Sequence, residues 1–221
     1  GLCELPPLSP DAGNAPRLGV ICRDRRMIGD LAPARHERFF PANSGAFNYL
    51  EIGSVRMDGT VEAEPVLHKE APSWATSYVR ACDVITSMVR PIRRLSALIS
   101  PEQDGFVCSS GFVVLQPKHI APEVLLTYLR FPVVCELMGL HTSASLYPAI
   151  LEHALLAFPM LNPDAKTCDA ICAAVRTSQV CTRQANTLLD AAKHALGIAI
   201  ENSETAALNY MDEILQDTSG H

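Results

Sequence analysis

The feature that most constrains the fold is a long C-terminal segment with a regular apolar seam. From about Asp164 to Gln216, apolar or small residues recur at about 3.5-residue spacing, as in a coiled coil. The seam consists of Cys168, Ile171, Val175, Ser178, Thr182, Ala185, Leu189, Ala192, Leu196, Ala199, Ser203, Ala206 and Tyr210. The pattern predicts one helix, which at ~1.5 Å per residue extends well beyond a single domain.

The start of this helix is marked by Asn162-Pro163-Asp164, and Gly197 lies inside it. Glycine costs ~1 kcal/mol against alanine in a helix, so a local break is compatible with the pattern. Two interpretations stay open: the helix folds back on its own domain, or it is a spacer that pairs with a helix of a second copy or second half. The second is favoured, and the candidate oligomerisation residues are Cys168, Ile171, Val175, Leu189, Leu196 and Tyr210.

The rest of the chain divides by composition. Residues 1–16 are rich in Pro, Gly and Asn and are expected to form an arm or linker, residues 17–163 a folded domain, 164–217 the helix and 218–221 a tail. Within the domain, the charged stretch from Arg23 to Asp30 is interpreted as a solvated loop or as a contact to DNA phosphate.

Strand patterns dominate from Phe47 onward. Alternating residues on both sides of Asp58-Gly59 predict a hairpin with a tight turn. Further strands are expected from Asp83, at 95–99, 105–108 and 111–115, with a turn at Pro101 to Asp104. The predicted fold class is therefore α+β, a mixed, strand-rich domain followed by a long helix of the coiled-coil type.

A basic loop follows the Asp83 strand. Pro91 ends that strand because it has no N–H for the ladder. Arg90, Arg93 and Arg94 would project guanidinium groups, which bind phosphate or read guanine O6 and N7. An exposed loop with salt bridges to nearby acids is the alternative interpretation.

Helical spacing returns from Pro122 to Gly139, with Pro132 expected to kink or split the helix. A polar loop of small residues follows, and a short helix at 150–156 and a closing strand at 155–159 complete the domain. Side chains of this loop are candidates for hydrogen bonds to phosphate or base edges, or else ordinary loop residues. The candidate DNA-binding residues are thus Arg56, Arg90, Arg93, Arg94, Ser143, Ser145 and Tyr147.

The net charge of −6 counts against a protein that coats DNA non-specifically, unless positive charge is concentrated on one face. The distribution is uneven. From Arg80 to Arg94 there are four arginines and one acid, whereas from Glu201 to His221 there are five acids and no Lys or Arg. DNA binding, if present, is therefore expected near the arginines.

The sequence shows no catalytic motif and no cofactor fingerprint. The eight cysteines have no CxxC pair and are interpreted as buried thiols, although Cys168 and Cys172 share a helix face, and a nucleophilic Cys108 is the alternative interpretation. No signal peptide or membrane span is evident, so a soluble, cytoplasmic protein without a membrane partner is expected.

The order of these motifs resembles the target-recognition domain of type I restriction-modification specificity subunits. In order they are the Tyr49-Leu50 hairpin, Asp83-Val84-Ile85, Arg90-Pro91, Ser109-Ser110-Gly111-Phe112, a helix, a small-residue loop, Phe158-Pro159 and the long helix. Family members carry Gly-Asp where this chain has Cys82-Asp83, which puts a tight turn in doubt. Members usually have two recognition domains and two long helices, and this chain has one of each.

The resemblance implies a division of labour. The recognition domain would read bases in the major groove of duplex DNA, and the helix would set the distance between two half-sites. A partner DNA adenine methyltransferase subunit with S-adenosylmethionine would perform the chemistry, and a motor-nuclease subunit would cut. The chain itself would be a non-catalytic specificity component without a cofactor, joined to a second half or to a second copy through the helix. Two alternatives remain: the recognition end of a fused restriction-methyltransferase enzyme, or a helix-mediated protein-interaction module without DNA binding.

Overall fold

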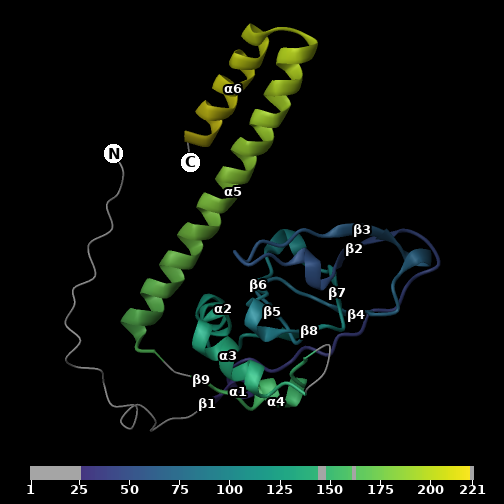
Figure 1. Cartoon of the computed structure of the whole chain (residues 1–221), viewed down its shortest axis with the longest axis vertical. Helices are drawn as coiled ribbons and strands as arrows, with labels where there is room; N and C mark the ends of the chain where they lie inside the picture. Colours follow the sequence, from purple (N-terminus) through teal and green to yellow (C-terminus); the bar gives the residue numbers. More distant parts are fainter. Residues whose placement is uncertain (1–25, 144–147, 161–162, 220–221) are drawn as a thin grey trace.

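The computed structural model describes residues 26–143, 148–160 and 163–219. A globular part made of short strands and helices carries a long helix that projects from it (Figure 1). The chain therefore combines a mixed α+β domain with an extended helical segment, as the sequence pattern predicted.

Two small sheets form the centre of the globular part. Three antiparallel strands lie in the order β6 (Ser96–Leu98), β5 (Val84–Ser87), β8 (Phe112–Leu115). Four strands form the other sheet, in the order β3 (Glu64–Leu67), β2 (Ala46–Leu50), β7 (Val107–Ser109), β4 (Ala75–Tyr78), with β2 and β7 parallel. A two-residue pair, β1 (Arg26–Met27) with β9 (Pro159–Met160), ties the start of the described chain to the end of the domain.

The main core lies between the three-stranded sheet and the helices. Every residue of β5 and β8 is buried, as expected for short strands covered on both faces. The helices are α1 (Ile28–Leu31), α2 (Pro122–Arg130), α3 (Pro132–Leu140) and α4 (Glu152–Leu156). They supply the fully buried side chains Ile28, Leu31, Leu125, Leu129, Met138 and Leu155.

Several strand and turn predictions are confirmed, and two need correction. The tight turn at Asp58-Gly59 is present, with Gly59 at φ +89 and a single bridge between Val55 and Val61. The ladder partner of β2 is, however, the later strand β3, so the hairpin spans a longer loop that contains the 3-10 helix η1 (Ile52–Ser54). The stretch from Arg23 to Asp30, expected as a solvated loop or a phosphate contact, forms β1 and most of α1 where it is described, because Ile28 and Leu31 enter the core. Its first three residues, 23–25, lie outside the described residues.

Pro132 splits the predicted helix in two, as expected, because proline lacks the N–H that would continue the ladder. Phe131 between α2 and α3 is extended, with φ −66 and ψ 127, which is the conformation favoured before proline. The remaining 3-10 helices are η2 (His68–Glu70), η3 (Pro91–Arg93) and η4 (Pro101–Gln103).

The C-terminal segment is a helical hairpin and not one continuous helix, which corrects the prediction. α5 (Ala165–Glu201) ends at Asn202, and α6 (Glu204–Ser219) runs back along it on the side away from the globular part (Figure 1). The break lies at Asn202-Ser203 because the Ser203 hydroxyl accepts a hydrogen bond from the Ala206 amide (3.3 Å) and so caps α6. Gly197, the predicted weak point, stays helical.

The first turns of α5 pack on the chain's own domain. Cys168, Ile171, Cys172 and Val175 lie against the main core, so the interpretation that the helix folds back applies to this part. Near them, the buried carboxylate of Glu123 accepts hydrogen bonds from Arg176 Nε (2.7 Å) and from Cys172 Sγ (3.7 Å). This contact between α2 and α5 fixes the base of the long helix.

The Glu123 contact predicts a pH-dependent stability. Burial alone would raise the pKa of Glu123, but its hydrogen bonds and the Arg176 guanidinium outweigh burial and lower the pKa below the usual value. Because the pKa of Glu123 is lower in the folded protein than in the unfolded chain, its carboxylate stabilises the fold at pH values above the unfolded pKa of about 4.3. This stability is lost as the pH falls through the pKa of the folded state.

We therefore expect Arg176→Ala to lower the free energy of unfolding at pH 7 only modestly, because Arg176 is largely exposed and solvent screens its charge. The variant should also lose less stability than the parent between neutral and acidic pH. Urea unfolding at several pH values measures both, with Lys193→Ala as a matched control on the same helix. Parallel pH profiles for parent and Arg176→Ala would contradict the role of the contact.

Among the residues that the structure describes, no helix is both long and apolar enough to cross a membrane.

Candidate nucleic-acid interface

Residues 88–95 join β5 to β6 in a tight, irregular turn that we call the arginine turn. Arg90 (φ 50, ψ 64) and Arg94 (φ 57, ψ 33) both adopt the left-handed conformation, on either side of η3. The amide of Arg93 donates to the carbonyl of Arg90, and that of Arg94 to the carbonyl of Pro91, both at 2.9 Å. Because Pro91 is buried and holds the turn in place, the flanking arginines have fixed backbone positions.

Residues 148–150, which follow the small-residue loop, pack against this turn. The Arg90 amide donates to the Pro148 carbonyl (2.9 Å), and the Ile150 amide donates to the Met88 carbonyl (3.0 Å). At the other end of the loop, the Ser143 amide donates to the Ala149 carbonyl (3.1 Å). The structure thus brings exposed Ser143 close to the arginine turn, whereas Ser145 and Tyr147 lie outside the described residues.

One of the four clustered arginines is neutralised within the fold. Arg80 is ion-paired with Glu37 and lies 3.5 Å from Asp104, and these carboxylates raise its pKa. The hydrogen bond from Arg80 in turn lowers the pKa of Glu37. Arg80 therefore belongs to a structural ion network and is not a candidate for DNA contact.

The same network holds the turn that leads into β5. Asp83, only 2% exposed, accepts hydrogen bonds from Arg35 Nε (2.6 Å), Arg35 Nη2 (3.0 Å) and the Arg80 amide (2.9 Å). Cys82 sits at φ +67, a conformation that favours glycine. The turn forms here despite the missing glycine, which resolves the doubt raised by Cys82.

Arg93 and Arg94 differ from Arg80, since both are exposed and neither forms an ion pair with a carboxylate among the described residues. The alternative of a loop neutralised by salt bridges therefore does not apply to these two side chains. Arg56 is exposed but is paired with Glu62 at 2.7 Å, so part of its charge is compensated.

A groove of about 800 Å³ begins at Arg94. One wall is formed by residues 57–61 and 98–103, and the other by residues 171–186 of α5. Arg130 lies in this groove and donates to the carbonyls of Met57 and Asp58, and burial lowers its pKa. Arg183 reaches the same groove from α5. Sequence reasoning missed Arg130 and Arg183, because each looks like an ordinary helix-surface charge and only the fold brings them to Arg94.

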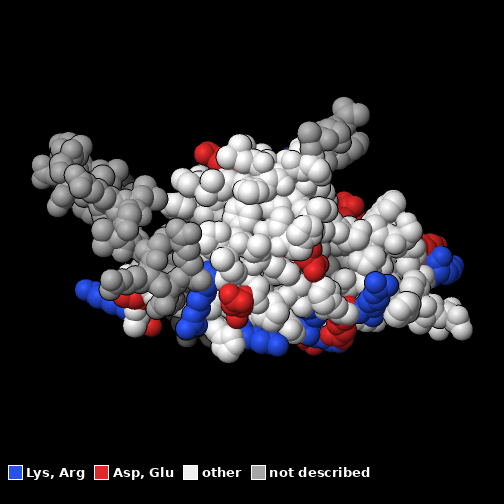
Figure 2. Space-filling view, turned by 90° about the horizontal axis from the view of Figure 1, so that it is seen from below, with Lys and Arg blue, Asp and Glu red and all other residues white. Residues whose placement is uncertain are grey.

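Positive charge does not cover the whole domain. Figure 2 shows the lower end of the molecule, where the middle of the surface is largely uncharged. Lys and Arg gather along one edge of that view and are interspersed with Asp and Glu (Figure 2). The described residues visible in this view therefore do not form the concentrated positive patch that duplex DNA favours.

The predicted oligomerisation residues fall into two groups. Cys168, Ile171 and Val175 are half-buried against the chain's own core, and their part in oligomerisation stays a prediction. Leu189 and Leu196 are 56% and 63% exposed on the distal half of α5. Tyr210 of α6 packs on His194 of α5, with ring centroids 5.1 Å apart, and so closes the hairpin.

The structure argues against Cys108 as a nucleophile. Cys108 is buried in β7, and burial raises its pKa to about 12, so its thiol stays protonated and weakly nucleophilic. No cluster of His, Cys, Asp and Glu suited to a metal ion is found within residues 26–143, 148–160 and 163–219.

No protein-family model matches the chain, and no curated protein matches it by sequence. Two solved structures share its fold. One belongs to work on complex assembly and conformational transition of the type I R-M system; it has a TM-score of 0.60 at 24% identity and covers 77% of this chain and 48% of that chain. The other, the HsdS subunit from Thermoanaerobacter tengcongensis, has a TM-score of 0.59 at 24% identity and covers 79% of this chain and 49% of its own.

The predicted resemblance in fold is therefore confirmed, since structures of the type I restriction-modification class match more than three quarters of the chain. The chain spans about half the length of each of them.

Proposed function

We propose that this chain reads the sequence of duplex DNA as one half of the specificity component of a type I restriction-modification methyltransferase. The observation that carries the proposal is a fold shared with the HsdS subunit, in which Arg93 and Arg94 are exposed and form no ion pair with a carboxylate of the residues that the structure describes. Guanidinium groups on a rigid turn suit bidentate reading of guanine O6 and N7. Arg90, Ser143, Ser145 and Tyr147 would add contacts around them, with the partly neutralised Arg56 at the margin.

The proposal assigns no catalysis to this chain. A DNA adenine methyltransferase subunit, holding S-adenosylmethionine, would perform the chemistry in the cytoplasm, and a motor-nuclease subunit would complete the complex. Support for such partners comes from the matched structure of the type I R-M system, whose complex assembly was the subject of that work.

Selection of bound sequences from a random duplex library, with the methyltransferase partner present, tests this function. We expect enrichment of a defined base pattern on one side of the site. A selected pool with the same composition as the input would reject sequence-specific reading.

The half-length match motivates a proposal about assembly: the missing half is supplied by a second copy of the chain or by a second half of a longer protein. Leu189 and Leu196 lie seven residues apart on α5 and are both more than half exposed. Such a pair suits the seam of a helix–helix interface. An interface here would complete the two-half arrangement.

We expect the double substitution Leu189→Glu and Leu196→Glu to convert an assembled species to monomers, because it places charges in the seam. Light scattering measures the mass, and thermal unfolding should show an unchanged monomer because both side chains are exposed. A variant with Glu at Val180, which is exposed on the same helix, controls for the added charge. Equal masses for parent and double variant, with and without the partner subunit, would count against an interface at this seam.

A second candidate function is a protein-interaction module that does not bind DNA. The net charge of −6 and the exposed leucines of α5 and α6 favour it. Fluorescence anisotropy with a mixed-sequence duplex separates the two, since only a DNA reader shows salt-dependent binding. The other alternative, the recognition end of a fused restriction-methyltransferase enzyme, is decided by the complete gene product.

A further inference from the structure

The α5 wall of the groove begins with the apolar residues Ile171, Ala174 and Val175, but its distal part has a chemistry that helix packing does not explain. Its described lining residues beyond Val175 are Ser178, Gln179, Thr182, Arg183 and Asn186, all of which carry hydrogen-bonding side chains. Ser178 and Thr182 belong to the predicted seam, yet they face this open groove and not another helix. A helix face meant for burial would carry apolar residues at these positions.

The charge of the groove is opposite in sign to that of the chain. Its lining contains three guanidinium groups, Arg94, Arg130 and Arg183, and two carboxylates, Asp58 and Glu102. Asp58 is turned into its own loop, where its Oδ1 accepts hydrogen bonds from the Thr60 amide (2.8 Å) and hydroxyl (2.7 Å). The described lining thus carries an excess of one positive charge in a chain whose net charge is −6, and Asp58 and Glu102 attract Arg130 and Arg183 respectively.

Arg130 contributes a positive charge that forms no ion pair among the described residues, although the Asp58 carboxylate attracts it. Its two terminal nitrogens donate to backbone carbonyls of the Asp58-Gly59 turn. Gly59 allows this approach, since a Cβ at that position would lie 2.6 Å from Arg130 Nη1. Carbonyls satisfy the N–H groups but leave the positive charge in place, so Arg130 adds to the positive potential next to Arg94.

We infer that the sugar–phosphate backbone of the bound duplex continues from the arginine turn into this groove and runs along α5. Arg183 contacts a phosphate, and the neighbouring Gln179 and Asn186 hydrogen-bond to the same strand. Phosphate and sugar contacts of proteins come mostly from such Arg, Ser, Thr, Asn and Gln side chains, and they fix register without reading sequence. The long helix is then a positioning element for DNA as well as a spacer. This inference rests on the proposed DNA-reading function.

The test is Arg183→Ala, assayed with the partner subunit present on a mixed-sequence duplex and on the selected duplex. Alanine preserves the helix, and Arg183 is exposed, so folding is unaffected. We expect weaker binding to both duplexes by the same factor, with the slope of log affinity against log salt smaller by about 0.9, the value for one phosphate. Arg183→Lys should restore the slope.

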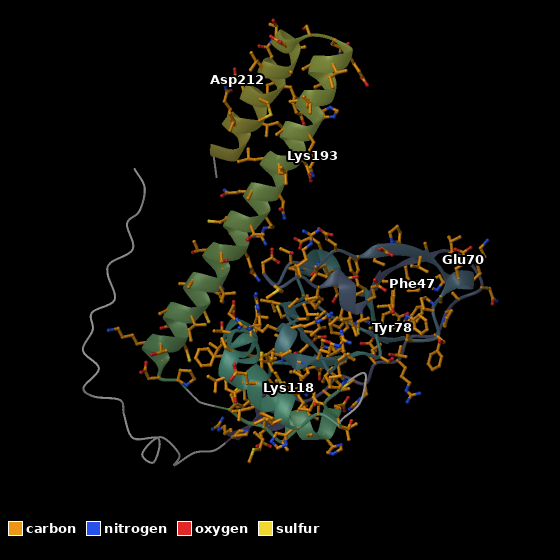
Figure 3. All side chains as sticks on the ribbon, viewed as in Figure 1. Phe47, Glu70, Tyr78, Lys118, Lys193 and Asp212 are labelled. Carbon is orange, nitrogen blue, oxygen red and sulfur yellow. The ribbon has the colours of Figure 1, made fainter. Side chains whose placement is uncertain are left out.

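The matched control is Lys193→Ala. Lys193 lies further along α5, away from the globular part (Figure 3), and is paired with Asp190 at 2.9 Å. It should leave the slope unchanged. A salt slope of Arg183→Ala equal to that of the parent overturns the inference. A change of oligomeric mass at unchanged DNA affinity also overturns it, because the groove then binds a protein segment. If the parent itself binds no duplex, the proposed function fails as well, so the two failures are distinguishable.

Discussion

Replacing Asp83 with alanine should lower the free energy of unfolding by about 3 kcal/mol, the largest stability effect that we expect from a single substitution. The carboxylate is almost fully buried and accepts three hydrogen bonds, two of them from Arg35. Its loss leaves a guanidinium, itself only 19% exposed, with the more distant Glu37 at 3.5 Å as its remaining carboxylate. Urea unfolding monitored by circular dichroism measures the loss.

The matched controls separate charge from packing. Asp83→Asn keeps one acceptor oxygen and should lose less stability than Asp83→Ala. The double variant Asp83→Leu with Arg35→Met removes both charges and should be more stable than Asp83→Ala alone, because breaking a buried pair costs more than replacing it with apolar groups. If Asp83→Ala unfolds at the same urea concentration as the parent, the pair does not hold the β5 turn.

The local elements of the fold could be predicted because their signals are local. A proline such as Pro132 removes a helix hydrogen bond wherever it stands in a helix. The strand β8 is recognisable as a continuous apolar run, FVVL, which ends at Leu115. The order of such elements along the chain was enough to indicate the fold that the solved structures share.

The errors concern partners that are distant in sequence. The pattern around Asp58-Gly59 predicted a short hairpin closed by that turn, whereas β2 pairs with β3 across a longer loop and, in parallel, with β7. Parallel pairing leaves no turn signal in the sequence. The proximal seam residues Ile171 and Val175 gave a heptad signal, but the apolar surface that they cover belongs to their own domain.

The break between α5 and α6 lies at a residue that also fits the heptad spacing. Ser203 fits the heptad spacing as a small residue, yet its hydroxyl caps α6. Serine is a good N-cap and a poor helix-interior residue, so Asn202-Ser203 is compatible with the end of one helix and the start of another. The prediction of one helix gave more weight to the regular apolar spacing. Regular spacing alone therefore does not distinguish one long helix from a helical hairpin.

The candidate interface could be predicted only in part. The arginine turn is contiguous in sequence, so its residues were identified directly. The docking of residues 148–150 on Met88 and Arg90 depends on backbone hydrogen bonds across the fold. The ion network around Arg80 depends on Glu37, far away in the chain, and no spacing rule connects the two. Only the structure separates the neutralised arginine from the others.

Replacing Arg90, Arg93 and Arg94 together with alanine should weaken binding to the selected duplex by 100-fold or more, about 3 kcal/mol for three contacts at roughly 1 kcal/mol each. The salt slope should fall by about 2 to 3, because up to three phosphates lose their partner. Anisotropy titrations at several salt concentrations, with the partner subunit present, give both quantities. Unchanged thermal unfolding would show that the turn, whose backbone is held by Pro91, remains folded.

Replacing the same three arginines with lysine distinguishes the contribution of positive charge from the reading of bases. Lysine keeps the positive charge but lacks the planar fork that binds guanine O6 and N7 bidentately. If the arginines read bases, the lysine variant keeps the salt slope and loses the preference for the selected duplex. If the arginines contact phosphate alone, the lysine variant keeps both the salt slope and the preference for the selected duplex. Parental affinity and slope in the alanine variant would exclude the arginine turn from the DNA interface and, with it, the proposed reading mechanism.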